Sequence, residues 1–304
     1  MAHDSSLTGL RRDHVGIIAG TWMRFSLRTG GGLMTILVVL IAGLSIAAAF
    51  TAPIEMVMQQ SNDLGHTTGE AASTIDRVAR SPEVARVAEW VTGADASQVN
   101  YLLQRQPALL SAMWLIMLMS FPFITGLGAF NQTSGDIGNR GLRYLLLRTE
   151  RPNIFIGRFL GTVGFIAASV ALMLAIVALY IGVKFNIYPL GELLAWTAQG
   201  YLAVILLCLP YVAMCAWMSG LLDSAFGSYA ICTLLIGFPI VFFKFANFAS
   251  HGKIPWLERL VPWGWKYDLL AGDLGTRLLA VLVMAGFTVG FLALGLRGFR
   301  KRDL

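Results

Sequence analysis

The sequence predicts an all-α, polytopic membrane protein with six transmembrane helices, an N-terminal interfacial helix and a helical external loop between spans 1 and 2. Three observations predict this class: scarce charge, six long apolar segments, and a basic excess on one side of them. Only 13% of the 304 residues are charged, 56% are hydrophobic, and the mean hydropathy is +0.67. A soluble domain carries about 25% charged residues. This composition excludes a soluble enzyme, a disordered chain and a secreted disulfide scaffold.

The spans follow from long runs without Asp, Glu, Lys or Arg, because a hydrocarbon core of about 30 Å requires about 20 apolar helical residues. Only Asp223 separates the fourth run from the fifth, and Gly220 and Gly227 favour a tight turn there. The polar leader before the first run is too long for a cleaved secretory signal. Residues 31–304 therefore form a six-span domain, with spans at approximately 31–53, 107–130, 157–183, 194–219, 226–246 and 277–297.

The positive-inside rule orients these spans. With both termini cytoplasmic, that side carries 13 Lys and Arg against 6 Asp and Glu, a net charge of +7, and the opposite side nets −1. The basic excess therefore indicates membrane topology, and no nucleic-acid partner is expected.

Residues 1–30 are expected to form a cytoplasmic tail and an interfacial elbow helix, with Trp22, Arg24 and Arg28 at the headgroups. The last external loop carries Trp256, Trp263 and Trp265, whose indole rings also favour the interface. A ligand-binding aromatic box is the alternative for that loop.

The external loop, residues 54–106, shows helical spacing of apolar residues at two places. We expect a small helical cap there, with a dedicated binding domain as the alternative. The first place has Ile75, Val78 and Ala79, and the second follows Pro82 with Val84, Val87, Ala88 and Val91.

No catalytic or metal-binding pattern stands out. Cys208, Cys215 and Cys232 lie in apolar stretches, so they are interpreted as small core residues rather than as a disulfide or metal framework. The spans lack the spacings of a zinc protease or a serine nucleophile, and they lack the intramembrane charges of a secondary transporter.

The internal loop, residues 131–156, is the most informative segment. Leu142, Leu145 and Leu146 form an apolar stripe with Arg143 and Arg148 beside it. This short amphipathic helix either transmits force to the two adjoining spans or rests on the membrane, and the pattern alone leaves both open.

This segment resembles the type-2 export permeases of ATP-binding-cassette (ABC) transporters, in particular the bacterial NosY-like six-span permeases. Those proteins show Gly-Glu, then Gly-Thr-Leu-Arg-x-Leu-Leu-x-x-Pro-x-x-Arg, then Gly-Lys-Phe-Leu-Gly. Here the corresponding runs are Gly135-Asp136, Gly141-Leu142-Arg143-Tyr144-Leu145-Leu146 and Gly157-Arg158-Phe159-Leu160-Gly161. The chain departs from the pattern in having Asp for Glu, in lacking the Thr, and in its different Pro-x-x-Arg segment.

The resemblance implies a permease subunit of an ATP-driven exporter in a bacterial inner membrane. The internal loop would be a coupling loop that docks on a separate ATPase chain. That chain would bind ATP and Mg, because this one has no phosphate-binding Gly-x-x-x-x-Gly-Lys-Ser/Thr run and so no ATPase site of its own. The expected docking residues are Gly135, Asp136, Arg140, Leu142, Arg143, Leu146 and Asp223.

The same resemblance implies two copies with a pathway between them. Gly157 with Gly161 and Gly286 with Gly290 allow close helix approach, between copies or within one chain. The alternative function is a non-transport scaffold or sensor that binds a partner through residues 54–106. Cargo is not specified, and the possible pathway residues are Met113, Met117, Phe121 and Phe123.

Overall fold

The computed structural model describes residues 11–63, 77, 80–184, 188–249 and 255–302, and within these ranges the chain is helical and has no strand. Six of its helices are long and apolar enough to cross a membrane, which confirms the predicted number of spans. They are α2 (Gly30–Asp63), α6 (Ala108–Ala129), α9 (Arg151–Lys184), α10 (Leu190–Leu221), α11 (Ala225–Ala249) and α12 (Leu274–Lys301).

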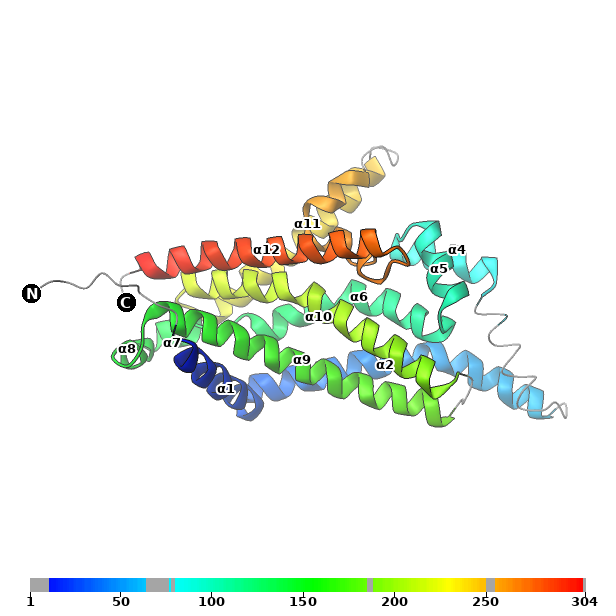
Figure 1. Ribbon diagram of the computed structural model, residues 1–304, viewed down its shortest axis with the longest axis horizontal. Helices are drawn as coiled ribbons and strands as arrows, with labels where there is room; N and C mark the ends of the chain where they lie inside the picture. The colour runs from blue at the N-terminus through cyan, green and yellow to red at the C-terminus, as the bar shows by residue number, and fades with distance from the viewer. Residues whose placement is uncertain (1–10, 64–76, 78–79, 185–187, 250–254, 303–304) are drawn as a thin grey trace, which may run out of the picture.

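The spans divide into a central pair and a periphery. The share of residues buried within the most apolar stretch of each helix is 72% for α10 and 67% for α6. It is only 17% for α11 and 22% for α12. Figure 1 shows α11 leaning away from the other spans. Large apolar side chains face outward on this helix, among them Phe238 and Phe245, and their exposure is more favourable in an apolar solvent than in water. The exposed faces are therefore suited to lipid or to another membrane helix.

The two ends of the bundle carry different short elements (Figure 1). At one end, called the α8 end, lie α7 (Ser134–Gly138) and α8 (Leu142–Leu146), with the start of α1 and the end of α12. At the other, the α4 end, lie α4 (Pro82–Thr92) and α5 (Ala96–Arg105). Three 3₁₀ turns also lie there: η1 (Pro255–Leu260), η2 (Pro262–Trp265) and η3 (Asp268–Leu270).

Helix α4 forms where the sequence predicted a helix after Pro82. The Ser81 hydroxyl accepts a hydrogen bond from the Val84 amide, and Gly93 ends the helix in the left-handed conformation at φ 66°. The earlier expected helix, around Ile75, Val78 and Ala79, lies outside the described residues. Helix α5 was not predicted, although the buried Val99, Leu102 and Leu103 have helical spacing.

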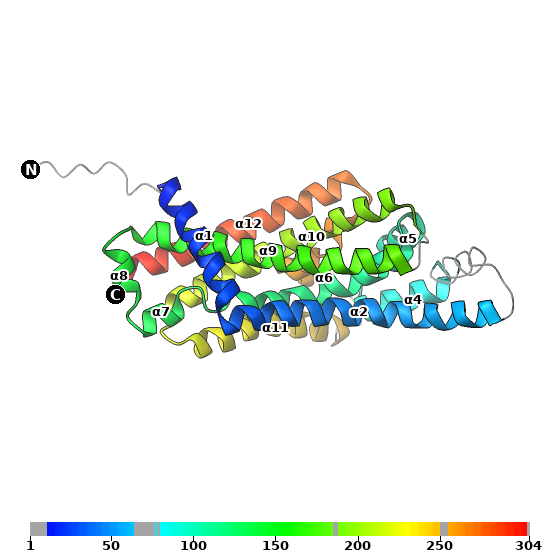
Figure 2. The same ribbon diagram turned by 90° about the horizontal axis from the view of Figure 1, so that it is seen from below.

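Helix α1 (Arg12–Arg28) runs obliquely across the bundle (Figure 2) and packs on the first half of α9. The approach is close because α9 presents glycines. A Cβ at Gly161 would lie 2.6 Å from the Ala19 carbonyl oxygen, and one at Gly157 would lie 2.8 Å from Ile18 Cβ. The Trp22 indole N–H then donates to the Thr162 hydroxyl at 2.9 Å. Packing within one chain thus accounts for this glycine pair.

We expect Gly161→Ala to lower the stability of the protein by about 1–3 kcal/mol, because the new methyl group meets a backbone oxygen that cannot rotate away. The thermal unfolding midpoint of the detergent-solubilised chain measures this. Gly20→Ala is the matched control, since it lies on the open face of α1 with nothing within 4 Å of the added carbon. Equal midpoints for the two variants would contradict the close approach.

Candidate functional site

The connection between α6 and α9 forms the centre of the α8 end. Asn131 organises its first turn, because its side-chain oxygen accepts from the Gly135 amide at 2.9 Å and from the Ser134 hydroxyl at 3.1 Å. Arg140 then adopts the left-handed conformation at φ 56°, which reverses the chain between α7 and α8. The connection is therefore a defined structure rather than an extended loop.

A buried arginine of α9 fixes this connection to the spans. Arg158 is 3% exposed, and its guanidinium pairs with the Asp136 carboxylate and donates to the Gln132 carbonyl oxygen at 2.7 Å. It also lies 4.6 Å from the centre of the Trp22 ring of α1. A buried guanidinium is tolerated only when its N–H donors have partners. The contacts of Arg158 with Asp136 and Trp22 therefore hold α1, α7 and α9 together.

Further hydrogen bonds attach the connection to α10. The Ser219 hydroxyl of α10 accepts from the amides of Thr133 at 2.8 Å and Ser134 at 2.9 Å. The Gln132 side chain donates to the Val212 carbonyl oxygen at 3.0 Å. Displacement of α7 therefore requires displacement of α10 as well.

The expected docking residues all lie at this end, but they differ in what they present. Arg140 and Arg143 are exposed. Leu142 is buried against Ile154, Phe155 and Phe299, so it supports α8 from beneath and offers no surface. Leu146 is half-buried on the same side.

The two acidic residues of that set have arginine partners within the chain. Asp136 is 41% exposed and is held by Arg158, whereas Asp223 is 72% exposed and is paired with Arg302. Gly135 is half-buried at the start of α7. The turn at Asp223 packs directly on α7, since a Cβ at Gly138 would lie 2.3 Å from the Asp223 carbonyl oxygen.

Two exposed residues at the tip were missed by the sequence analysis. The side chains of Tyr144 and Leu147 are 77% and 84% exposed, next to the exposed Arg143 and Arg148. Their spacing of three residues would have indicated a shared outward face. The apolar stripe favoured Leu142 instead, because a sequence pattern does not show which face of a short helix is covered.

The α4 end holds a second buried cation. Lys266 is buried with its ammonium 3.3 Å from the centre of the Trp263 ring and 4.3 Å from that of Tyr267. Burial, followed by the neighbouring ammonium of Lys244, lowers the pKa of Lys266 to about 7, while Glu258 and Asp268 act in the opposite direction. Lys244 itself pairs with Glu258 at 3.3 Å.

The expected interfacial tryptophans are placed differently from one another. Trp256 is exposed and Trp265 is half-buried, but Trp263 is buried in the core beneath Lys266 and does not reach the surface. On α1, Trp22 is half-buried on Arg158, while Arg24 and Arg28 are exposed.

The possible pathway residues belong mostly to the core of one chain. Met113, Met117 and Phe121 are buried within the chain, and Phe123 alone of the four is exposed. The three cysteines are buried and free, and no group of His, Cys, Asp or Glu in the described part of the chain is suited to hold a metal.

No protein-family model matches this chain, and no curated protein matches it.

We expect Asp136→Asn to destabilise the protein by about 1.5–3 kcal/mol, because it weakens a hydrogen bond to a buried charge. Asp223→Asn is the matched control: its carboxylate is mostly exposed, so the loss is about 1 kcal/mol or less. Denaturant unfolding in detergent compares the two. A larger loss for Asp223→Asn would contradict the role of Arg158.

Stability is expected to rise with pH between about 7 and 10.5, since unfolded Lys266 retains its proton in this range while the folded protein has lost it. Within this range the free energy of unfolding rises by at most about 1.4 kcal/mol per pH unit. Below about pH 7 the contribution of Lys266 no longer changes with pH. Thermal unfolding from pH 6.5 to 10 measures it. Lys266→Met removes this slope; an unchanged slope in that variant would refute the assignment.

Proposed function

We propose that this chain is the membrane-spanning permease subunit of an ATP-driven, ABC-2 type exporter. The observation that carries the proposal is the helical turn α7–α8, which is exposed at its tip. Its base is joined to α9 and α10 by hydrogen bonds and to α12 by packing. In this proposal the α8 end and both termini are cytoplasmic in a bacterial inner membrane, and α1 lies in the interface. The exposed Ile17 and Phe25 would then face lipid near Arg24 and Arg28.

The tip has the composition of a protein-binding surface. Tyr144 and Leu147 offer exposed apolar area, and Arg140, Arg143 and Arg148 of the same segment are exposed as well. Tyrosine and arginine are enriched among the residues that dominate binding energy at interfaces. The partner is an ATPase subunit, which binds ATP and Mg; no cofactor is assigned to this chain.

Force on the tip would reach the spans through packed side chains. Leu142 of α8 packs with Phe155 of α9 and Phe299 of α12, and the two phenylalanine rings lie 5.8 Å apart. Because a close-packed cluster deforms little, movement of α8 would be passed to both spans. Rigid coupling of this kind is what an exporter driven by a separate ATPase requires.

A second copy of the chain completes the proposed pathway. Gly286 and Gly290 of α12 have nothing within 4 Å of an added Cβ, so packing within this chain does not use them. Leu282 and Val289 beside them are exposed. Small residues on an outward membrane face favour close approach of another helix, which supports a homodimer.

The alternative is a scaffold or sensor that binds a protein through the α4 end. One observation favours it: Trp90 and Val87 of α4 are exposed. An exposed tryptophan outside the spans is a candidate anchor for a partner.

Copurification in mild detergent from the native membrane separates the two functions. We expect an ATPase subunit to accompany the wild-type chain, and Tyr144→Ala with Leu147→Asp to reduce its recovery at least about tenfold, a loss of about 1.4 kcal/mol. Val87→Asp with Trp90→Ala is the matched control at the opposite end, and it leaves the recovery unchanged. Absence of any ATPase from the wild-type preparation, or a loss confined to the control variant, would reject the proposal.

A further inference from the structure

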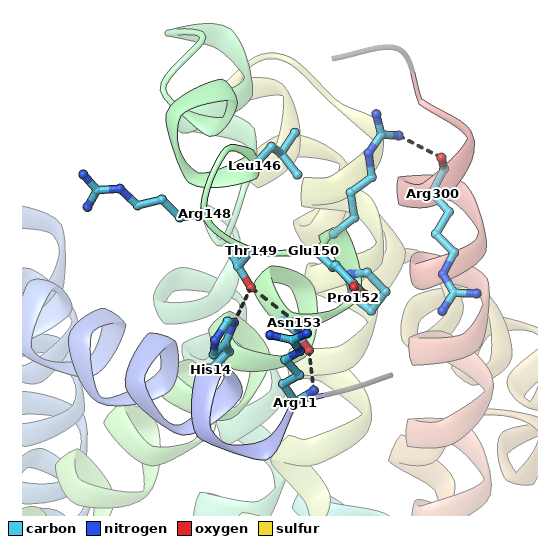
Figure 3. A pocket seen from close by; sticks show the side chains of 10 residues that line it. Arg11, His14, Leu146, Arg148, Thr149, Glu150, Pro152, Asn153 and Arg300 are labelled. Carbon is cyan, nitrogen blue, oxygen red and sulfur yellow. Dashed lines mark hydrogen bonds between the residues drawn. The ribbon is translucent and has the colours of Figure 1, made fainter. Parts of the chain in front are cut away.

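A basic pocket of about 690 Å³ lies beside α8, at the junction of three helices. Figure 3 shows that the lining residues lie around the first turn of α9, with α1 on one side and α12 on the other. The lining residues are Arg11, His14, Leu146, Arg148, Thr149, Glu150, Arg151, Pro152, Asn153 and Arg300.

The charge in this pocket is strongly unbalanced. Four arginines accompany one carboxylate, that of Glu150, and no ion pair joins these arginines to a carboxylate within the described residues. Figure 3 shows the Arg148 side chain pointing away from Arg11 and Arg300, which lie on opposite sides of the first turn of α9. An excess of positive charge around one pocket favours a bound anion.

The structure holds these groups in place without neutralising them. The Arg151 guanidinium donates to the carbonyl oxygens of Arg300 at 2.8 Å and Arg302 at 2.6 Å, which fixes its position but leaves its charge. The Arg11 amide donates to the buried Asn153 side chain at 3.1 Å. The N-terminus of α9, a helix of 34 residues, adds its positive dipole end to the same place.

The depth of the pocket follows from the proposed position of α1 at the membrane interface. His14 of α1 lines the pocket, and the Arg11 amide just before α1 donates to Asn153. In the proposed arrangement α1 lies in the headgroup layer, which extends about 5–8 Å beyond the hydrocarbon core. The pocket at the start of α1 is then at the level of the lipid phosphates.

We infer that this pocket binds a phosphate group, and that the source is the headgroup of an anionic membrane lipid. Soluble phosphate shares this chemistry, but the depth favours the lipid. Basic pockets between membrane helices on the cytoplasmic side are known to take such headgroups. The lipid assignment rests on the proposed position of α1. Arg11 and Arg300 of the pocket lie outside the docking tip, so variants of these two residues test the pocket separately from ATPase docking.

Lipid titration of the purified full-length chain tests the inference. The probes are phosphatidylglycerol, phosphatidylcholine and inorganic phosphate, with binding followed by native mass spectrometry and by thermal unfolding. We expect tighter binding of phosphatidylglycerol than phosphatidylcholine, and Arg11→Gln with Arg300→Gln to weaken it roughly tenfold to thirtyfold. Both side chains are exposed and donate no hydrogen bond to another described residue, so the variant is expected to fold.

Arg12→Gln with Arg297→Gln is the matched control, because it removes two exposed arginines at the same end that do not line the pocket. We expect its affinity for phosphatidylglycerol to fall less than threefold. Equal losses in the two variants, or no preference for the anionic lipid, would overturn the site. Binding of inorganic phosphate as tight as the lipid, with the same dependence on Arg11 and Arg300, would overturn the lipid assignment. Unchanged ATPase recovery in the pocket variant would show that the two surfaces are separate.

Discussion

The guanidinium of Arg158 is the constraint on which the α8 end depends. A charge within a span is costly unless carboxylate, carbonyl or aromatic groups replace the water it loses. Asp136 and the Gln132 carbonyl oxygen provide two of these groups, and they reach Arg158 only because the chain after α6 turns back over α9. Trp22 provides the third, and it reaches Arg158 because glycines on α9 admit α1. One buried cation thus fixes the positions of three segments that are distant in the sequence.

The α4 end also holds a buried basic side chain, that of Lys266, but in different surroundings. Lys266 also lies against an indole ring, but no ion pair joins it to a carboxylate in the described chain, and burial lowers its pKa. The α8 end thus holds its charge in a fixed ion pair, while the α4 end holds a group whose charge depends on its surroundings.

Much of the fold could be predicted because its signals are local. The six spans, the turn at Asp223 and helix α4 each follow from charge-free length or capping residues within one segment. The site was less predictable because its contacts join distant positions. The Asp136–Arg158 pair links two of the motif runs, and the glycine pairs at 157/161 and 286/290 have the same spacing but opposite surroundings. Burial of Trp263 and Leu142 likewise depends on neighbours that no local pattern specifies.

The burial of all three native thiols has a practical consequence for studying this protein in sealed vesicles. Cys208, Cys215 and Cys232 lie within packed helices, where aqueous reagents have little access. A cysteine placed at the exposed Leu147 or Trp90 would be the reactive thiol of the molecule without removal of the native ones. Each end can therefore carry a chemical label that reports its side of the bilayer and its distance from a bound partner.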